Sequence, residues 1–501
     1  MEGSPTDDVE ATSILSVGDR SHYTIHTPHS TCYTRIHRTA HQDELRREQV
    51  PAGDGTAVHR AGTGKTSATQ VVQLSSWDSS YVGFQVAALL IFDGPVHQPV
   101  EAVKKGLSGR SSTTSQSPVL AAENGEDGGL LHVACTGEGV PFVAASAGYA
   151  LRTTGLDAPF STSLLDDLAV SYPAGAEGCR RTDPLLLMQV TEFACGGFTV
   201  GVTWNHTLAD GDGMAQFLQA VGELARAEAD DVLGPSVAPV RDGRAVSLPL
   251  LSPPVVAAKQ WLMLDRGGMG LVYLDVTVPV KLINRIKSEY KAAHSSDGGY
   301  CTTFEAAVAV LWRCRTRAII GDDPDYDMST PAPLAFFVNV RKHVGAAAGY
   351  YGNCAVAQLA FATTGEVAGA GDGGMNEVVD LIKRAKDRVP DLLRTLGAGG
   401  GAVEDMGEQE MAATFGYNAL MVTSWRNIGF DRADFGAGAP ARVVGRWQQS
   451  TVPGCMAFLS CRATADDGER LLTQCVREEH AAALLAELDK LAHAPSATDV
   501  W

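Results

Sequence analysis

The sequence places a histidine and an aspartate four residues apart, in the stretch HTLADG at residues 206–211. An imidazole with the ordinary pKa of about 6.5 is largely neutral at pH 7, so it can accept the proton of a hydroxyl or an amine. His206 and Asp210 are therefore candidate catalytic residues. The spacing alone also fits a turn histidine beside a carboxylate that caps the next helix, a role that Asp212 could fill.

The elements on either side of this pair indicate how it would be held. Residues 198–205 alternate apolar side chains on one face, which predicts a strand, and residues 214–225 carry apolar side chains at helical spacing. His206 then lies in the turn between the strand and the helix. Reactive groups in α/β proteins gather at the carboxyl ends of strands, so we expect His206 to face a cleft from a rigid mount.

Beyond this helix the pattern predicts a linker and a second set of elements. Five prolines lie between residues 230 and 254, which favours a long crossover segment. The residues after it predict a strand over 271–278, helices over 281–293, 304–312 and 376–389, and a capping box formed by Thr302 and Glu305. Strands and helices on both sides of a linker predict two α/β lobes of similar size.

A second motif-like stretch is VTSWRNIGFDRADFGAG at residues 422–438. Together, the two stretches resemble the signatures of the plant BAHD acyl-CoA-dependent acyltransferases. The His-x-x-x-Asp-Gly signature is matched by His206, Asp210 and Gly211, and the Asp-Phe-Gly-Trp-Gly signature by residues 434–438. Residues 185–213, 302–318 and 336–353 also look like the family, and the resemblance runs from about residue 71 to the C-terminus.

The resemblance implies an α/β, two-lobed fold like that of chloramphenicol acetyltransferase. Each lobe is then a mixed sheet with helices, and an active-site channel lies between the lobes. On this basis we expect residues 70–229 to form the N-terminal lobe, 230–268 the crossover linker and 269–501 the C-terminal lobe. Residues 1–69 read as a disordered or mis-predicted extension, because they are rich in His, Ser and Thr and show little apolar periodicity.

The resemblance also implies the reaction. An acyl group of the hydroxycinnamoyl, benzoyl or acetyl type would pass from acyl-CoA, the co-substrate, to an alcohol or amine acceptor, with no permanently bound cofactor and no metal. A divergent member that binds CoA esters or acceptors without turnover is the alternative. A serine hydrolase is a more distant one, because the sequence around Ser146 is one residue short of a nucleophile elbow.

Roles for individual residues follow from the family pattern. Asp210 would point away from the substrate and pair with Arg341, while the indole N–H of Trp425 would help to hold the oxyanion. Asp434 is included as a lower-ranked catalytic candidate that is more often structural, and Gly211 and Gly436 as structural support. Residues that bind coenzyme A are not assigned, although four basic residues lie near the motifs: Arg341, Lys342, Arg426 and Arg442.

The chain departs from the family pattern at position 437 and over residues 107–122. Ala437 stands where the second signature has Trp, which removes an aromatic contact but keeps both glycines of the turn. Residues 107–122, LSGRSSTTSQSPVLAA, replace a Tyr-Pro-Leu-Ala-Gly-Arg-Leu stretch with a polar, turn-rich one. This replacement predicts a damaged first lobe.

Composition excludes several other classes of protein. The 501 residues carry a net charge of −18, which disfavours binding to nucleic acid or to anionic membranes. No secretory signal and no Cys-x-x-Cys pair are present, so we expect a cytoplasmic, monomeric protein with reduced thiols. The glycine-rich stretches at 62–66 and 369–374 match nucleotide-binding motifs only in part or out of context.

Overall fold

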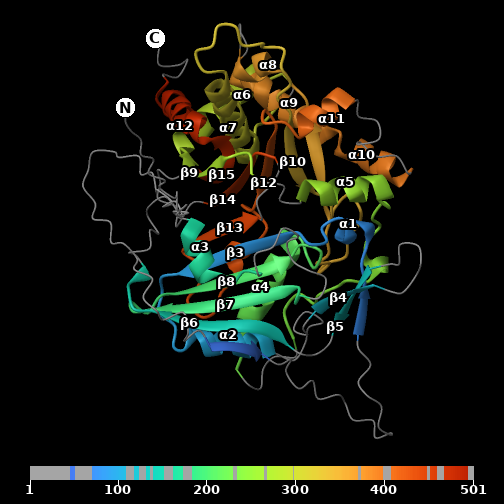
Figure 1. Ribbon diagram of the computed structural model, residues 1–501, viewed down its shortest axis with the longest axis vertical. Coiled ribbons are helices and arrows are strands. Elements are labelled where there is room, and N and C mark those ends of the chain that lie inside the picture. The colour runs from blue at the N-terminus through green and yellow to red at the C-terminus, as the bar shows by residue number, and fades with distance from the viewer. Residues whose placement is uncertain are drawn as a thin grey trace, which may run out of the picture. The chain divides into compact units, whose positions relative to one another are not determined.

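The computed structural model describes residues 46–50, 70–108, 118–122, 131–135, 139–151, 162–172, 183–228, 234–263, 268–296, 298–369, 374–398, 408–447, 452–459 and 468–494. Their strands form two six-stranded mixed sheets and one three-stranded sheet, with helices packed against them (Figure 1). The expected α/β class is confirmed. Most of residues 1–69 lie outside the described residues, but Arg46–Val50 forms strand β1.

The first sheet forms the first lobe together with helices α2 (Pro99–Ser108), α3 (Thr162–Leu168) and α4 (Gly211–Arg226). Its strand order is β1, β6 (Val140–Ala147), β7 (Leu186–Phe193), β8 (Phe198–Asn205), β3 (Gln85–Phe92) and β13 (Arg442–Trp447). Only β6 and β7 pair in parallel among these neighbours. Helices α2 and α4 pack closely because Gly106 carries no side chain: a Cβ there would lie 2.2 Å from the carbonyl oxygen of Val221.

Strand β8 leads into the turn that holds His206, and it is buried along its whole length. The sequence predicts one buried face, but all eight residues of the strand are buried. The second face is covered by the end of α3, which passes so close that a Cβ on Gly201 would lie 2.3 Å from the carbonyl oxygen of Leu168. A strand enclosed on both faces is a rigid mount for the residue that follows it.

The second sheet forms the second lobe. Its strand order is β11 (Ala355–Ala360), β10 (Leu334–Asn339), β12 (Leu420–Ser424), β14 (Gly454–Leu459), β15 (Glu469–Arg477) and β9 (Leu271–Val278). β12 runs parallel to both its neighbours, and the other pairs are antiparallel. The helices of this lobe are α6 (Val280–Ala293), α7 (Thr303–Ile320), α8 (Thr364–Ala368), α9 (Met375–Asp387), α10 (Val389–Gly397), α11 (Glu408–Thr414) and α12 (Glu478–His493).

Helix α7 is the central helix of the second lobe. It begins at the predicted capping box, in which Thr302 and Glu305 exchange side-chain to backbone hydrogen bonds of 3.2 Å and 2.8 Å. It runs past the predicted end at residue 312 to Ile320, because its polar residues also find buried partners. The fully buried guanidinium of Arg315, for example, donates to the carbonyl oxygen of Cys475 at 2.7 Å.

The segment predicted as a crossover linker is partly helical. It contains a 3-10 turn at Gly243–Ala245 and helix α5 (Pro253–Met263), which packs against the short helix α1 (Ser76–Ser79). The indole N–H of Trp77 in α1 donates to the carbonyl oxygen of Pro249 at 2.7 Å. The proline-rich stretch is therefore attached to the first lobe rather than free.

The polar stretch 107–122 is only partly described. Leu107 is buried in the last turn of α2, and Pro118–Ala122 forms β4, which pairs with β5 (Leu131–Cys135) and through it with β2 (Gln70–Gln73). Residues 109–117 lie outside the described residues. The described ends of this stretch are regular, so they show no sign of the damage that the sequence predicts.

One strand from the C-terminal part of the chain joins the first sheet. β13 pairs antiparallel with β3, although both its sequence neighbours, β12 and β14, belong to the second sheet. Arg442 at its start donates to Asp275 of β9 at 2.8 Å, and Arg470 of β15 donates to the same carboxylate at 2.7 Å. The predicted boundary at residue 269 stays a prediction, but this exchange links the two lobes.

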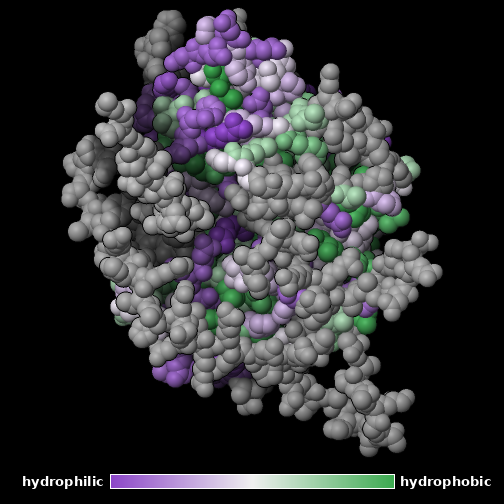
Figure 2. All heavy atoms as spheres, viewed as in Figure 1, coloured by the Kyte–Doolittle hydropathy of each residue, from purple (hydrophilic) through white to green (hydrophobic). Residues whose placement is uncertain are grey.

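The surface view shows the polar character of the second lobe. Described hydrophilic residues gather at the top of Figure 2, over helices α6, α8 and α9 of Figure 1. Among the described residues, no helix combines the length and the apolar character needed to cross a bilayer.

Candidate active site

His206 lies in the turn directly after β8, where its backbone is held on both sides. Its N–H donates to the carbonyl oxygen of Phe84 at 2.7 Å, and its carbonyl oxygen accepts from the Asn353 side chain at 2.9 Å. The imidazole packs on the ring of Tyr81, with centroids 4.3 Å apart, and at 5.7 Å from that of Phe84. The first lobe thus contacts the ring, and a loop of the second lobe holds the backbone of the same residue.

A pocket with about 870 Å³ of empty volume lies in front of the imidazole. Both lobes line it, and most of the lining is apolar or aromatic. The lining residues are Tyr81, Phe84, Val86, Trp204, His206, Asp210, Gly211 and Asp212 from the first lobe, and Phe337, Asn339, Ala355, Met421, Thr423, Ser424, Trp425, Ile428 and Met456 from the second. None of these described residues is a lysine or an arginine. The expected cleft before His206 is therefore present.

Asp210 does two structural jobs at the start of α4. Its carboxylate caps the helix by accepting from the N–H of Gly213 at 3.0 Å, so the capping role open to Asp212 belongs to Asp210 instead. The same carboxylate accepts two parallel hydrogen bonds from Arg341, at 2.9 Å and 2.7 Å, and one from the N–H of Cys354 at 3.0 Å. The structure thus brings Asp210 and Arg341 together as the family pattern implies.

Asp212 lies two residues further on and lines the pocket. Its carboxylate accepts from the Asn339 side chain at 3.0 Å and lies 3.6 Å from Arg341. Burial and the nearby charge of Asp210 raise the pKa of Asp212 to about 6, against the opposing effect of Arg341. Asp212 is therefore a titratable group of the pocket that sequence reasoning did not assign to the site.

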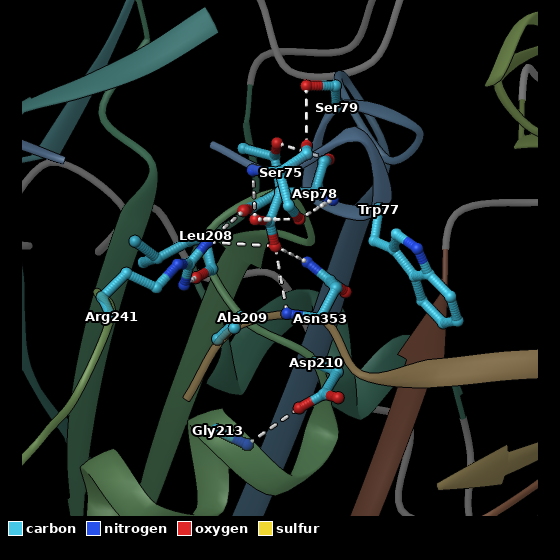
Figure 3. A network of polar contacts seen from close by, with 12 residues as sticks. Ser75, Trp77, Asp78, Ser79, Leu208, Ala209, Asp210, Gly213, Arg241 and Asn353 are labelled. Atoms are coloured by element: carbon cyan, nitrogen blue, oxygen red, sulfur yellow. Dashed lines mark hydrogen bonds and ion pairs between the residues drawn. The ribbon is translucent and has the colours of Figure 1, made fainter. Parts of the chain in front are cut away.

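Asn353 is the residue of the site that sequence reasoning missed most clearly. Its side-chain nitrogen donates to the carbonyl oxygen of His206 and to the Asp78 carboxylate, both at 2.9 Å (Figure 3). Because both partners are acceptors, the amide nitrogen must point at them and the amide oxygen must point away. The oxygen is buried without a hydrogen-bond partner among the described residues, and the Asn353 side chain acts to raise the pKa of His206.

Nδ1 of His206 and the side-chain oxygen of Asn353 are two buried atoms that have no hydrogen-bond partner among the described residues. An amide oxygen can only accept, so a hydrogen bond between these two atoms would require the ring proton on Nδ1 and would leave Nε2 unprotonated. The signal that could have revealed Asn353 is its place at the end of the family-like stretch 336–353, to which no role was given.

The imidazole is neutral at physiological pH. Burial lowers the pKa of His206 to about 4, and the ammonium group of Lys259 acts in the same direction, while Asp210 and Asn353 oppose them. Lys259, on α5, lies over the ring of Tyr81, with its Nζ 4.3 Å from the ring centroid. A neutral imidazole with a bare nitrogen can act as a base.

Trp425 lies across the pocket from α4 and is 8% exposed. Its indole stacks on Phe430 at 4.8 Å and packs against Trp204 at 6.3 Å. A Cβ on Gly211 would lie 3.9 Å from the indole nitrogen, so the polar edge of the ring faces the start of α4. The indole N–H therefore points toward Gly211, at the pocket end of α4.

Asp434 does not line this pocket. One carboxylate oxygen accepts from the N–H groups of Gly436 and Gly438, both at 2.8 Å, and the other lies 3.1 Å from Arg226 of α4. Gly436 has a φ of +109° and Gly438 of +79°, so both glycines of the second signature serve the turn. The structure separates Asp434 from His206 and gives it a structural position.

The structure also shows where the basic residues near the motifs and Ser146 lie. Of the four basic residues near the motifs, Arg442 is buried against Asp275, Arg426 pairs with Glu469 at 2.9 Å, and Lys342 is exposed. Ser146 is exposed on β6 and does not line the pocket. Within the described ranges, no group of three His, Cys, Asp or Glu side chains could hold a metal ion.

Comparisons with known proteins show what the whole chain is similar to. A family model described as the Transferase family matches residues 63–480. Acyl transferase 15 of Oryza sativa subsp. japonica is 36% identical over 88% of this chain and 98% of its own length. A myricetin 3-O-glucosyl 1,2-rhamnoside 6'-O-caffeoyltransferase of Crocosmia x crocosmiiflora is 31% identical over 81% of this chain and 90% of its own.

Solved structures share the fold. Vinorine synthase superposes with a TM-score of 0.65 at 18% identity, covering 89% of this chain and 97% of its own. TRI101 of F. graminearum, in a complex with coenzyme A and T-2 mycotoxin, superposes with a TM-score of 0.61 at 16% identity, covering 83% of this chain and 97% of its own. The two-lobed fold predicted from the sequence is confirmed.

Proposed function

Since the chain belongs to the BAHD acyltransferase family, we propose that it moves an acyl group from acyl-CoA to the hydroxyl or amine of a small acceptor. His206 is the general base of this reaction. The observation that carries the proposal is the neutral imidazole of His206, which lines a pocket shared by the two lobes.

In the proposed reaction, Nε2 of His206 takes the proton of the acceptor as its oxygen or nitrogen attacks the thioester carbonyl carbon. The tetrahedral intermediate carries a negative charge on the former carbonyl oxygen, and the indole N–H of Trp425 is the proposed donor to it. The carbon–sulfur bond then breaks, and the imidazolium returns its proton to the departing thiolate. The products are an ester or an amide, free coenzyme A and neutral His206.

The pocket favours an aromatic or otherwise apolar acyl group. Phe337, Met421 and Met456 of the second lobe and Trp204 of the first line it, and such side chains stabilise flat rings by burial and stacking. A hydroxycinnamoyl or benzoyl donor uses this lining better than an acetyl donor does. Acyl-CoA is a co-substrate in this proposal, and the protein acts as a cytoplasmic monomer.

The test is the release of coenzyme A by the purified full-length protein. Acetyl-, benzoyl- and hydroxycinnamoyl-CoA are each offered with a panel of alcohols and amines. We expect His206→Ala to lower kcat by about 10²- to 10⁴-fold, the usual contribution of a general base. His343→Ala, which removes an exposed histidine near Arg341, is the matched control. Equal rates for the His206→Ala and unchanged proteins would reject the proposed base.

The alternative is a divergent member that binds CoA esters or acceptors without turnover. Isothermal calorimetry that detects acyl-CoA binding, together with no transfer to any acceptor of the panel, would favour it. A thioester hydrolase would instead release coenzyme A without an acceptor. Hydrolysis that survives His206→Ala but not Ser146→Ala would identify such an activity.

A further inference from the structure

Asp78 forms a buried charged cluster that the proposed reaction does not use directly. It lies in the short helix α1, and only 1% of its surface is exposed. One carboxylate oxygen, Oδ2, accepts from the N–H of Ser75 at 2.9 Å and from its hydroxyl at 2.6 Å. These contacts cap α1 and account for Oδ2 alone.

The other carboxylate oxygen, Oδ1, gathers donors from distant parts of the chain. It accepts from the backbone N–H of Asn353 at 3.0 Å and from the Asn353 side chain at 2.9 Å. It also lies 3.0 Å from a guanidinium nitrogen of Arg241, which comes from the crossover segment. Figure 3 shows Arg241 and Asn353 converging on Asp78 from opposite sides.

Both partners of Oδ1 also hold the catalytic turn. Asn353 donates to the carbonyl oxygen of His206, and Arg241 donates to the carbonyl oxygens of Thr207 and Leu208. Three consecutive carbonyl groups are thus bound by side chains that Asp78 anchors. In addition, the Thr207 hydroxyl donates to the backbone carbonyl oxygen of Asp78 at 2.7 Å.

The cluster is a sealed, charge-balanced unit. The Arg241 side chain is 6% exposed, and its guanidinium lies 4.8 Å from the centroid of the Tyr351 ring. A buried carboxylate and a buried guanidinium that share several hydrogen bonds hold each other in one geometry, because loss of either leaves an unpaired buried charge. Because Arg241 and Asn353 bind its carbonyl groups, the turn that carries His206 is held in the same fixed geometry.

We propose that Asp78 is a positioning residue for acyl transfer: it orients the Asn353 amide and anchors Arg241, so that His206 presents a bare Nε2 to the pocket. This inference rests on the proposed function, since it assigns to Asp78 the task of preparing the general base. Asp78 itself lies outside the pocket lining and contacts no substrate.

Asp78 acts on His206 through the orientation of the Asn353 side-chain amide. With a carboxylate at position 78, the Asn353 nitrogen is drawn to Asp78 and to the His206 carbonyl oxygen, which leaves the amide oxygen for Nδ1, an atom that has no other partner among the described residues. Without the carboxylate only the His206 carbonyl oxygen still holds the amide nitrogen, so the amide can rotate by half a turn and present its N–H groups to Nδ1. The imidazole then shifts its proton to Nε2, and the nitrogen that must accept the substrate proton is blocked.

The kinetic test compares Asp78→Asn with Ser75→Ala. The first variant removes the charge from Oδ1 at nearly constant volume, and the second weakens only the cap of α1. We expect kcat of Asp78→Asn to fall on the order of 10- to 100-fold, the size known for outer partners of metal-binding imidazoles. Its KM for acyl-CoA should stay within about threefold, because no binding contact changes.

Ser75→Ala separates positioning from simple destabilisation. It should lower the melting temperature, as Asp78→Asn does, but leave kcat unchanged. Arg241→Lys is the second variant, because its ammonium group keeps the charge but cannot reach both carbonyl groups. We expect it to lower kcat without raising KM. Equal kcat values for all three variants and the unchanged protein would overturn the proposal.

The tautomer provides a test that does not depend on turnover. Nitrogen NMR of protein with ¹⁵N-labelled histidine distinguishes Nδ1–H from Nε2–H, and the His206→Ala variant assigns the His206 signals. We expect the Nδ1–H form in the unchanged protein and a mixture in Asp78→Asn. An Nε2–H form in the unchanged protein would overturn the proposal, even if all variants failed to fold. Full activity of His206→Ala would instead reject His206 as the general base, and absence of acyl transfer in the unchanged protein would reject the proposed function.

Discussion

Arg341 binds Asp210 through two parallel hydrogen bonds, and the same guanidinium donates to two backbone carbonyl groups of the neighbouring loop. These carbonyl groups belong to Tyr350, at 3.3 Å, and Gly352, at 2.9 Å. Asp210 in turn caps α4 and accepts from the N–H of Cys354. One planar guanidinium therefore joins the start of α4 to the loop that carries Asn353.

Replacing Arg341 by lysine should lower kcat by at least about tenfold, because an ammonium group cannot reproduce a two-pronged contact with a carboxylate. The start of α4 and the Asn353 loop would then be free to separate, and with them the two groups that hold His206. Steady-state kinetics with acyl-CoA checks this expectation. Arg244→Lys is the control, since Arg244 makes a similar contact with Asp242 on the exposed surface. Equal losses in both variants would contradict the argument.

The pH dependence of kcat/KM should reflect the lowered pKa of His206. The unfolded chain binds a proton at this histidine near pH 6.5, whereas the folded protein does so only near pH 4. The base therefore stays competent down to about pH 5, and kcat/KM should not fall between pH 7 and pH 6 because of His206. Folded stability contributed by the neutral ring is lost as the pH falls from 6.5 toward 4.

The titration of Asp212 must be distinguished from that of His206 in this measurement, because the pKa of Asp212 is raised to about 6 and its side chain lines the same pocket. Product formation is followed by chromatography between pH 4.5 and 8 in the unchanged protein and in Asp212→Asn. A fall near pH 6 that disappears in Asp212→Asn belongs to the carboxylate. A fall near pH 6.5 that persists in this variant would show that the imidazole titrates normally.

Trp425 should act through the position of its N–H group. Trp425→Phe keeps an aromatic ring but removes the donor, and loss of one oxyanion donor costs about 10²- to 10³-fold in kcat. Gly445→Ala provides a second test, because a Cβ there would lie 2.6 Å from the six-membered ring of the indole. The ring must shift, so kcat should fall although the N–H is retained. Unchanged kcat in Trp425→Phe would remove Trp425 from the proposed mechanism.

Local sequence pattern predicted the elements on either side of the His206 turn. Strand β8, the capping box of α7 and the helix after Asp210 follow from periodicity and from capping chemistry, which act between near neighbours. The family resemblance added the two-lobed fold and the pairing of Asp210 with Arg341. Both kinds of signal come from residues that can be recognised from their immediate sequence neighbours.

Contacts between distant residues escaped prediction for a physical reason. Asp78 and Asn353 are 275 residues apart, and nothing around either one indicates that they share a hydrogen bond. The same holds for the pairing of β13 with β3 in the first sheet and for the contact of Lys259 with the Tyr81 ring. Such contacts depend on how the lobes pack, so only the folded chain reveals them.

The loop of the second signature should contribute to stability rather than to turnover. Asp434 binds two N–H groups of its own turn, and Phe435 packs edge-on against Phe92 with centroids 5.6 Å apart. Asp434→Ala leaves these N–H groups without their acceptor and should lower the free energy of unfolding by about 1–3 kcal/mol. Because Asp434 lies outside the pocket lining, kcat should change by less than about threefold.

Gly222→Ala tests the same loop from the side of α4. A Cβ at position 222 would lie 2.3 Å from the carbonyl oxygen of Asp434, so the helix and the loop must move apart. Denaturant unfolding should show a loss of stability in both Gly222→Ala and Asp434→Ala, while both variants keep near-normal kcat at temperatures where they are folded. A kcat of Asp434→Ala as low as that of His206→Ala would instead make Asp434 a proton-handling residue. That result would require the loop to reach the pocket during turnover.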